Sequence, residues 1–541
     1  MAATFDILIR NGLVCDGTGA PAWTGDVAIS GDRIAAVGHL DGACAAQVVD
    51  AAGLVVAPGF IDAHSHSDTY LLLEPDAPSK ISQGVTTEIC GQCGASAAPL
   101  VGQARLPADW AAQRYPVKRS ARLSTGADGT GPTWSSVAEY RALLEQVQPA
   151  VNTVLLIGHN TLRAGVMGYE SRGATADELR SMQRHLAQAL DEGGSGLSTG
   201  LVYQPGRYAS ADEVLGLARM VAARGGVYAS HMRSEGDQLL EALDEVLDLG
   251  RASGVRVQVS HLKTSHAHNW GKLDAVFQRI AAAQRQGVVV HADRYPYLAG
   301  ATDLDIVLPD WAGRGGREVV LARVADASLR ARIAAELDAE REPDAWEGVM
   351  IGGTVHPDLR VWRGATIASV AQATGRTAGT VIVDVLRLDE LRTGAFFFGM
   401  SEANLRRIYA QPWVMVGSDA SIRALQGPLR ADHPHPRAYG AFPRFLRLVQ
   451  DEGLLTLPEA IRRLTSLPAD AFGLQGRGRV VPAALADLVL FDPVEICDQA
   501  TFAAPHVYSR GVRQVWVNGC NSYEHGQCTG RRAGRMLQSR F

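Results

Sequence analysis

Residues 58–66 read Pro-Gly-Phe-Ile-Asp-Ala-His-Ser-His and follow the apolar run Leu54-Val-Val-Ala57. A short apolar run of this kind is typical of a buried strand, and two histidines, His64 and His66, come soon after it. On a strand, side chains at positions i and i+2 point to the same face, so both imidazoles can converge on one ion. The stretch therefore predicts a metal site at the end of a strand.

Three more potential ligands end predicted strands further along the chain. His231 closes Val-Tyr-Ala-Ser-His, His261 closes Val-Gln-Val-Ser-His, and Asp419 closes Trp-Val-Met-Val-Gly-Ser-Asp. The carboxyl ends of parallel strands are where barrel enzymes build their active sites. Five potential ligands at four strand ends predict a metal centre more strongly than any single histidine does.

Strands and helices alternate through the centre of the chain. Capping boxes at Thr175-Ala-Asp-Glu178 and Ser210-Ala-Asp-Glu213 open two amphipathic helices, and further helices are expected at about 236–251 and 272–286. This alternation predicts βαβ units and a parallel sheet. Over roughly 400 residues, a (β/α)8 barrel with insertions fits better than several doubly wound domains. The expected fold class is α/β.

Both ends of the chain look like β-structure. Hairpin turns are predicted at Asn11-Gly12, at 30–32 and at Asn518-Gly519. Neither end has enough strands for a core of its own, so we expect one small β-sandwich domain built from both. The expected division is 1–57 and 478–541 for this domain and 58–477 for the barrel, with an inserted subdomain at about 302–370.

Composition limits the class of protein. The 541 residues are 46% hydrophobic and 20% charged, and 52 basic against 57 acidic residues give a net charge of −5. This balance argues against a dedicated nucleic-acid binder. No apolar run is long enough to span a membrane, no secretory signal is visible, and seven cysteines do not suggest a disulfide framework. A soluble cytoplasmic enzyme is expected, with its oligomeric state open and the domain of both termini a conceivable dimer interface.

Two local motifs have competing interpretations. Cys90-Gly-Gln-Cys93 could be a redox pair, a zinc ligand or structural thiols, and spacing alone leaves Cys93 divided between ligand and structural thiol. Gly196-Leu-Ser-Thr-Gly200 matches a nucleophile elbow, but Pro205-Gly206 follows where that elbow requires a helix. Ser198 is therefore not expected to be a nucleophile.

Taken as a set, the motifs resemble those of the N-acyl-D-amino-acid deacylases, or D-aminoacylases, of the amidohydrolase superfamily. The resemblance runs nearly end to end. It is carried by residues 58–66, Gln83-Gly-Val-Thr-Thr87, Gly91-Gln-Cys-Gly94, Gly158-His159, 196–203, Ser230-His-Met-Arg233, Ser260-His-Leu-Lys263, Asp293-Arg-Tyr-Pro-Tyr297, Gly417-Ser-Asp419, His435-Pro-Arg437 and Gly440-Ala-Phe-Pro-Arg444. Leu262 and Ala301 depart from the pattern, as does the length of 419–437, and these departures concern the substrate pocket.

The resemblance implies a zinc enzyme in which a cysteine is a central ligand. Cys93, His231 and His261 would form a tight zinc site, and His64, His66 and Asp419 a second, weaker site that shares the cysteine. Asp419 would also act as general base and then general acid for a metal-activated water.

The resemblance also implies the substrate and its contacts. N-acyl-D-amino acids would be cleaved to a carboxylate and a free D-amino acid, with Lys263, Tyr295 and Arg437 holding the substrate carboxylate and Tyr203 assisting the oxyanion. The alternative is the same metal chemistry on another amide, such as a cyclic imide or ureide, a dipeptide, an aryl amide or a formamide. A non-catalytic scaffold is disfavoured by the complete ligand set.

Overall fold

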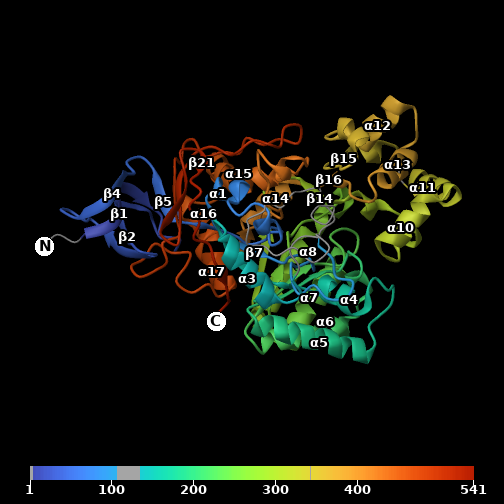
Figure 1. Ribbon diagram of the computed structural model, residues 1–541, viewed down its shortest axis with the longest axis horizontal. Helices are drawn as coiled ribbons and strands as arrows, with labels where there is room; N and C mark the ends of the chain where they lie inside the picture. Colours follow the sequence, from blue (N-terminus) through green and yellow to red (C-terminus); the bar gives the residue numbers. More distant parts are fainter. Residues whose placement is uncertain (1–3, 107–133, 341–342) are drawn as a thin grey trace.

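The centre of the computed structural model, which describes residues 4–106, 134–340 and 343–541, is a barrel of parallel strands (Figure 1). The strands, in barrel order, are β6 (Phe60–Asp62), β7 (Val85–Cys90), β8 (Asn152–Leu155) continued by β9 (Ile157–Gly158), β10 (Gly196–Gly200), β11 (Val227–His231), β12 (Arg256–Val259), β13 (Val290–Arg294) and β17 (Val414–Val416). The Ala63 N–H donates to the Val416 carbonyl at 3.2 Å, and the Asp419 N–H donates to the His64 carbonyl at 2.8 Å. These bonds bring the first and last strands together, as the (β/α)8 prediction requires.

Helices alternate with these strands and cover them. They are α1 (Pro78–Ile81), α3 (Val137–Val147), α4 (His159–Met167), α5 (Ala176–Asp191), α6 (Ala211–Ala222), α7 (Leu239–Ser253), α8 (Leu273–Arg285), α14 (Glu402–Tyr409), α15 (Arg437–Glu452), α16 (Leu457–Leu464) and α17 (Ser466–Ala471). Thr175 forms the predicted capping box with Glu178 at the start of α5. Each amphipathic helix buries an apolar stripe, with Leu186, Leu217 and Ile280 fully inaccessible. The barrel core is therefore closed on its outer side by helices.

Strands from both ends of the chain pair in one nine-stranded sheet, at the left of Figure 1. Its members are β1 (Thr4–Val14), β2 (Trp23–Ser30), β3 (Arg33–Gly38), β4 (Cys44–Asp50), β5 (Val55–Pro58), β18 (Leu488–Phe491), β19 (Val512–Val517), β20 (Cys520–Glu524) and β21 (Gln527–Cys528). The antiparallel pair β5–β18 joins the two ends. The last strand, β22 (Met536–Leu537), instead pairs with β8, so the end of the chain lies against the barrel.

The hairpin predicted at Asn11-Gly12 is wrong. Strand β1 continues through these residues, and its register with β2 shifts between Ile9 and Gly12. Asn11 has a φ of 61°, a conformation that serves a bulge as well as a two-residue turn. The predicted turns at 30–32 and 518–519 are confirmed by the antiparallel pairs β2–β3 and β19–β20.

An inserted unit with its own apolar core lies between barrel strands β13 and β17, at the end of the molecule opposite the terminal sheet (Figure 1). Its elements are β14 (Ala299–Asp303), α9 (Asp310–Gly313), α10 (Gly316–Ala325), α11 (Ala327–Glu340), β15 (Val349–Ile351), α12 (Ile367–Thr374), α13 (Ala378–Leu388) and β16 (Gly394–Phe398). The core runs from Leu304 to Ala395, past the expected end near residue 370, because α13 packs into it. Among the described residues, no helix has both the length and the apolar character needed to cross a membrane.

Candidate metal centre

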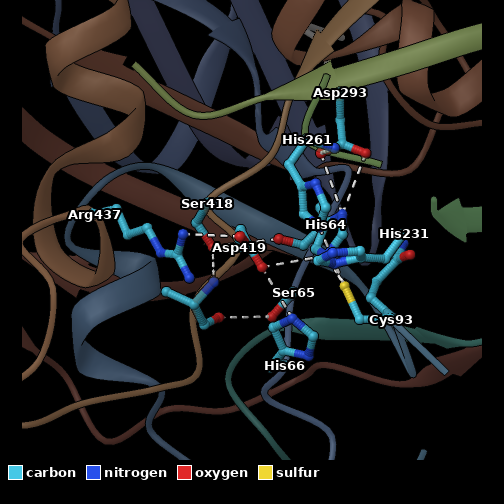
Figure 2. A network of polar contacts seen from close by, with 12 residues as sticks. His64, Ser65, His66, Cys93, His231, His261, Asp293, Ser418, Asp419 and Arg437 are labelled. Atoms are coloured by element: carbon cyan, nitrogen blue, oxygen red, sulfur yellow. Dashed lines mark hydrogen bonds and ion pairs between the residues drawn. The ribbon is translucent and has the colours of Figure 1, made fainter. Parts of the chain in front are cut away.

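The six predicted ligands meet at the carboxyl ends of the barrel strands (Figure 2). They follow or end five barrel strands: His64 and His66 follow β6, Cys93 follows β7, His231 ends β11, His261 follows β12, and Asp419 follows β17. Two groups of ligand atoms each lie within 4.8 Å of one another: Cys93, His231 and His261 in one, and His64, His66, Cys93 and Asp419 in the other. Cys93 is the member that the two groups share.

The spacing of the donor atoms suits zinc. Cys93 Sγ lies 3.3 Å from His64 Nε2 and 3.4 Å from His261 Nε2. Ligands bound to zinc at about 2.0–2.3 Å in a tetrahedral arrangement lie about 3.5 Å apart. A thiolate, imidazoles and a carboxylate are also the donor types that zinc prefers. The residues present therefore fit the metal.

The backbone at three of the ligands is held in the left-handed region. The φ angles are 53° at Cys93, 36° at His261 and 51° at Asp419. Such conformations cost non-glycine residues on the order of 1–3 kcal/mol each and persist where the surrounding structure enforces them. Their occurrence at three strand ends around one point is typical of a functional site.

Two of the ligands are held in their anionic forms. Burial raises the pKa of the Cys93 thiol, but the charges of His64 and His261 outweigh burial and hold it well below its usual range. Burial likewise raises the pKa of Asp419, and Arg437 and His64 outweigh it and bring it well below the ordinary value. A thiolate and a carboxylate are the forms that bind a cation.

Asp293 orients one of the histidines, a role that sequence reasoning missed. Its carboxylate lies 3.2 Å from His64 Nδ1 and accepts a hydrogen bond of 2.9 Å from the His261 backbone N–H. A carboxylate on Nδ1 turns Nε2 toward the metal and raises its basicity. Asp293 lies in β13, near the same barrel edge as the ligands, and this position was the available signal.

Glu235 does the same for the group of Cys93, His231 and His261 and was also missed. Its Oε1 lies 2.8 Å from His261 Nδ1, and it forms an ion pair with Lys263. Lys263 Nζ is in addition 2.8 Å from His261 Nδ1. The predicted carboxylate-binding lysine thus lies beside the metal centre but is already engaged by Glu235. The available signal was the spacing of four residues between His231 and Glu235.

The other predicted substrate contacts line a cavity of about 600 Å³ that opens onto the ligands. Tyr203, Tyr295 and Arg437 all face it, and the Tyr203 ring lies 4.9 Å from the ring of His231. The Arg437 guanidinium lies 4.7 Å from the centre of the Tyr295 ring. It also forms an ion pair with Asp419 at 2.8 Å, while its Nε makes no hydrogen bond to the described residues. Arg437 therefore lines the cavity directly beside the metal centre, with its Nε buried.

The fold and the site together define a barrel enzyme with a cysteine-containing metal centre at the carboxyl ends of its strands. The chain belongs to the amidohydrolase family, whose sequence profile it matches over residues 47–523. It is 38% identical to N-acyl-D-glutamate deacylase from Alcaligenes xylosoxydans xylosoxydans, over 99% of this chain and 97% of that protein. It is 36% identical to D-aminoacylase from the same organism, over 98% and 97%.

A solved structure is similar over the whole chain. N-acyl-D-glutamate deacylase from Bordetella bronchiseptica, complexed with zinc and a phosphonate inhibitor that mimics the reaction's tetrahedral intermediate, superposes with a TM-score of 0.82. The two proteins are 35% identical, and the comparison covers 99% of this chain and 100% of the other.

Proposed function

We propose that this protein is a zinc-dependent hydrolase that cleaves N-acyl-D-amino acids to a carboxylate and a free D-amino acid. The relatives named for this activity match the chain almost from end to end. The preference for the D form is supported by these relatives alone, and the chemistry is supported by the geometry of the ligands and of Arg437.

The proposed metal ligands are Cys93, His231 and His261 for the tight site and His64, His66 and Asp419 for the second group, which shares Cys93. Zinc held there supplies a Lewis acid that polarises an amide carbonyl and acidifies water. The Asp419 carboxylate accepts the proton of the attacking water and then donates it to the amide nitrogen, which is a poor leaving group until protonated. In this proposal the hydroxyl of Tyr203, which lines the cavity beside His231, donates to the oxyanion.

The observation that carries the proposal is the position of Arg437 next to Asp419. A guanidinium that lines the cavity, 2.8 Å from the proton-transfer carboxylate, places a substrate carboxylate close to the scissile bond. In an N-acyl amino acid the carboxylate and the nitrogen of the scissile amide are attached to the same carbon. Because a guanidinium binds a carboxylate through two parallel hydrogen bonds, it also fixes the orientation of the substrate.

Part of the cavity lining is apolar. It includes Met400, Phe397, and Ile306 and Val307 of the 3-10 helix Leu304–Val307, beside the polar Thr302, Asp303 and Arg105. A Cβ atom at Gly300 would lie 3.6 Å from Met400 Cε and 3.7 Å from the Tyr295 hydroxyl, so the wall begins beside the carboxylate contacts. Since the substrate side chain shares its carbon with the carboxylate, we propose that the preferred D-residue is apolar.

Two basic side chains at this cavity already have carboxylate partners. Lys263 is paired with Glu235, and Arg105 lies 3.4 Å from Glu318. An acidic side chain would have to compete with Glu235 for the buried Lys263, or with Glu318 for Arg105 in an exposed ion pair that contributes little.

The experiment is amine release by zinc-loaded protein from matched N-acetyl-D- and N-acetyl-L-amino acids, with apolar and acidic members. Release from D forms alone supports the proposal. If protein that has bound zinc releases amine from neither form, the substrate proposal is wrong and the proposed metal centre is unaffected. The proposal includes the cytoplasmic location expected from the sequence, which cell fractionation tests.

A further inference from the structure

Directly behind the ligands lies a group of charged side chains that no step of the proposed reaction uses. Lys80, Asp62 and Glu88 are all fully buried. Lys80 Nζ lies 2.8 Å from Asp62 Oδ2 and 3.1 Å from Glu88 Oε1. Burial lowers the pKa of Lys80, but the two carboxylates outweigh burial and raise it, so the ammonium stays charged. Buried ion pairs contribute little net stability, so we expect the role of these charges to lie in positioning other residues.

The ammonium of Lys80 is bonded to both neighbours of Asp419. Nζ donates to Ser418 Oγ at 2.8 Å and to the Ala420 carbonyl at 2.8 Å. These hydrogen bonds hold the residues on both sides of Asp419. The Asp419 carboxylate therefore cannot move without breaking a buried, charge-assisted hydrogen bond.

The same ammonium reaches the two-histidine segment. Nζ lies 3.2 Å from the hydroxyl of Ser65, the residue between His64 and His66. Ser65 in turn donates to Glu88 Oε1 at 2.6 Å. Figure 2 shows Ser65 and Ser418 on the side of the centre where His66 and Asp419 lie. One charge therefore ties the segments that carry three of the ligands.

Asp62 links the same two segments a second time. Its Oδ1 accepts from the Ser418 backbone N–H at 2.8 Å and from the His64 backbone N–H at 3.2 Å, and its Oδ2 accepts from the Ser418 hydroxyl at 2.6 Å. The ammonium and this carboxylate thus form a closed set of bonds across the gap between β6 and β17. Within the described part of the chain, the recorded hydrogen bonds and ion pairs of Lys80 and Asp62 include none to residues 230–232 or 260–262.

We infer that Lys80 is a positioning residue that, with Asp62 and Glu88, sets the place of Asp419 relative to His64 and His66. It acts on the second ligand group and leaves the group of Cys93, His231 and His261 in place. This inference rests on the proposed metal centre but not on the choice of substrate.

The test is cobalt(II) titration of apo-protein, read by the thiolate-to-cobalt absorption band and by total metal bound per chain. Three variants are compared with the wild-type protein. Lys80→Met removes the charge at similar length, Ser418→Ala removes one tie without leaving a buried charge unpaired, and Arg477→Met breaks a buried ion pair with Asp487 in the terminal-domain region. Ser418→Ala keeps the test valid if Lys80→Met fails to fold.

The expected result is selective. The first cobalt ion binds Lys80→Met with an unchanged thiolate band, whereas the dissociation constant of the second rises about 10- to 100-fold, with a smaller rise in Ser418→Ala. Arg477→Met loses thermal stability without changing either affinity. With the best substrate, kcat of Lys80→Met falls about tenfold while KM changes less than about threefold.

Three results would overturn the inference. These are unchanged binding of both ions in the Lys80 and Ser418 variants, equal weakening of both ions, and uptake of only one ion by the wild-type protein. The last result would mean that the group of His64, His66 and Asp419 does not bind a second ion, so Lys80 would have no metal site to position. Amine release from N-acetyl-D-amino acids is measured separately, so a failure of the substrate proposal is distinguishable from a failure of this one.

Discussion

Arg437 Nη1 lies 2.8 Å from Asp419 Oδ2, while the other oxygen of the same carboxylate, Oδ1, lies 3.0 Å from His66 Nε2. The aspartate is therefore shared between the metal centre and the predicted carboxylate-binding arginine. This contact links substrate binding to proton transfer, because Arg437 is proposed to bind the substrate carboxylate and Asp419 to transfer the proton. It also explains why the pKa of Asp419 stays low despite burial.

Replacing Arg437 by lysine should weaken substrate binding more than it slows chemistry. The ammonium keeps the charge but cannot form two parallel hydrogen bonds to a carboxylate. We expect KM to rise about 10- to 100-fold with a smaller change in kcat. Steady-state kinetics with the best N-acyl-D-amino acid measures this. Arg447→Lys, on the outer side of the same helix, is the control, and an unchanged KM in Arg437→Lys would remove the arginine from the carboxylate site.

Removal of the metal should abolish turnover and lower stability together. Cys93 belongs to both ligand groups, so Cys93→Ala should bind neither ion tightly, whereas His66→Ala should keep the first. Because a ligand that binds only the folded state stabilises it, chelation should lower the Tm of the wild-type protein and leave that of Cys93→Ala nearly unchanged. Differential scanning fluorimetry with and without chelator checks this. An equal shift in both proteins would contradict the assignment of Cys93.

The apolar wall should decide the side-chain preference. We expect kcat/KM for N-acetyl-D-leucine or D-methionine to exceed that for N-acetyl-D-glutamate by at least about tenfold, which is about 1.4 kcal/mol. Ile306 faces the cavity and is 38% exposed, so Ile306→Arg can add a cation there without a buried cost. Ile306→Arg should lower the ratio of kcat/KM for the apolar substrate to that for the acidic one. Val361→Arg, at an exposed position outside this cavity's lining, is the control. A wild-type preference for the acidic substrate would refute the role of the wall.

Stability should fall in mild acid because of one partly buried histidine outside the site. Burial, with help from Arg256, lowers the pKa of His291 to about 4 from its ordinary 6.5. Between these values the unfolded chain binds a proton that the folded protein does not, so the free energy of unfolding decreases as pH falls from 6.5 to 4, by up to about 3 kcal/mol. Urea unfolding of wild-type and His291→Gln proteins at several pH values measures the difference. The free energy of unfolding of His525→Gln, a change at an exposed position, should depend on pH as that of the wild type does. If the pH dependence of His291→Gln were also the same as that of the wild type, His291 would not be the cause.

Much of the centre was predictable from sequence because barrel geometry puts strand ends together. His231, His261 and Asp419 each stand where an apolar run gives way to a helix or loop, and that local pattern is enough to place them at one edge. Cys93 lies beyond such a run, and its spacing alone could not separate a ligand from a structural thiol. The family resemblance supplied that choice.

The supporting residues could not be predicted in the same way. Asp293 and Lys80 act through side-chain contacts between segments more than 200 residues apart, and no local period marks such contacts. Glu235 lies four residues after His231, but that spacing alone does not distinguish it from any other acidic residue in a loop. The bulge at Asn11 and the far end of the insertion were misjudged for a related reason. A positive φ serves turns and bulges alike, and the amphipathic α13 has the same pattern as a barrel helix.

The most direct test of the account is the ratio of kcat/KM for N-acetyl-D-methionine to that for N-acetyl-L-methionine, with zinc-loaded wild-type protein and Asp419→Asn. We predict a ratio above about 100 for the wild type and a loss of at least about a thousandfold in kcat for the variant, because asparagine keeps the shape of the side chain but cannot accept the proton. Equal turnover of both enantiomers, or near-normal turnover by Asp419→Asn, would contradict it.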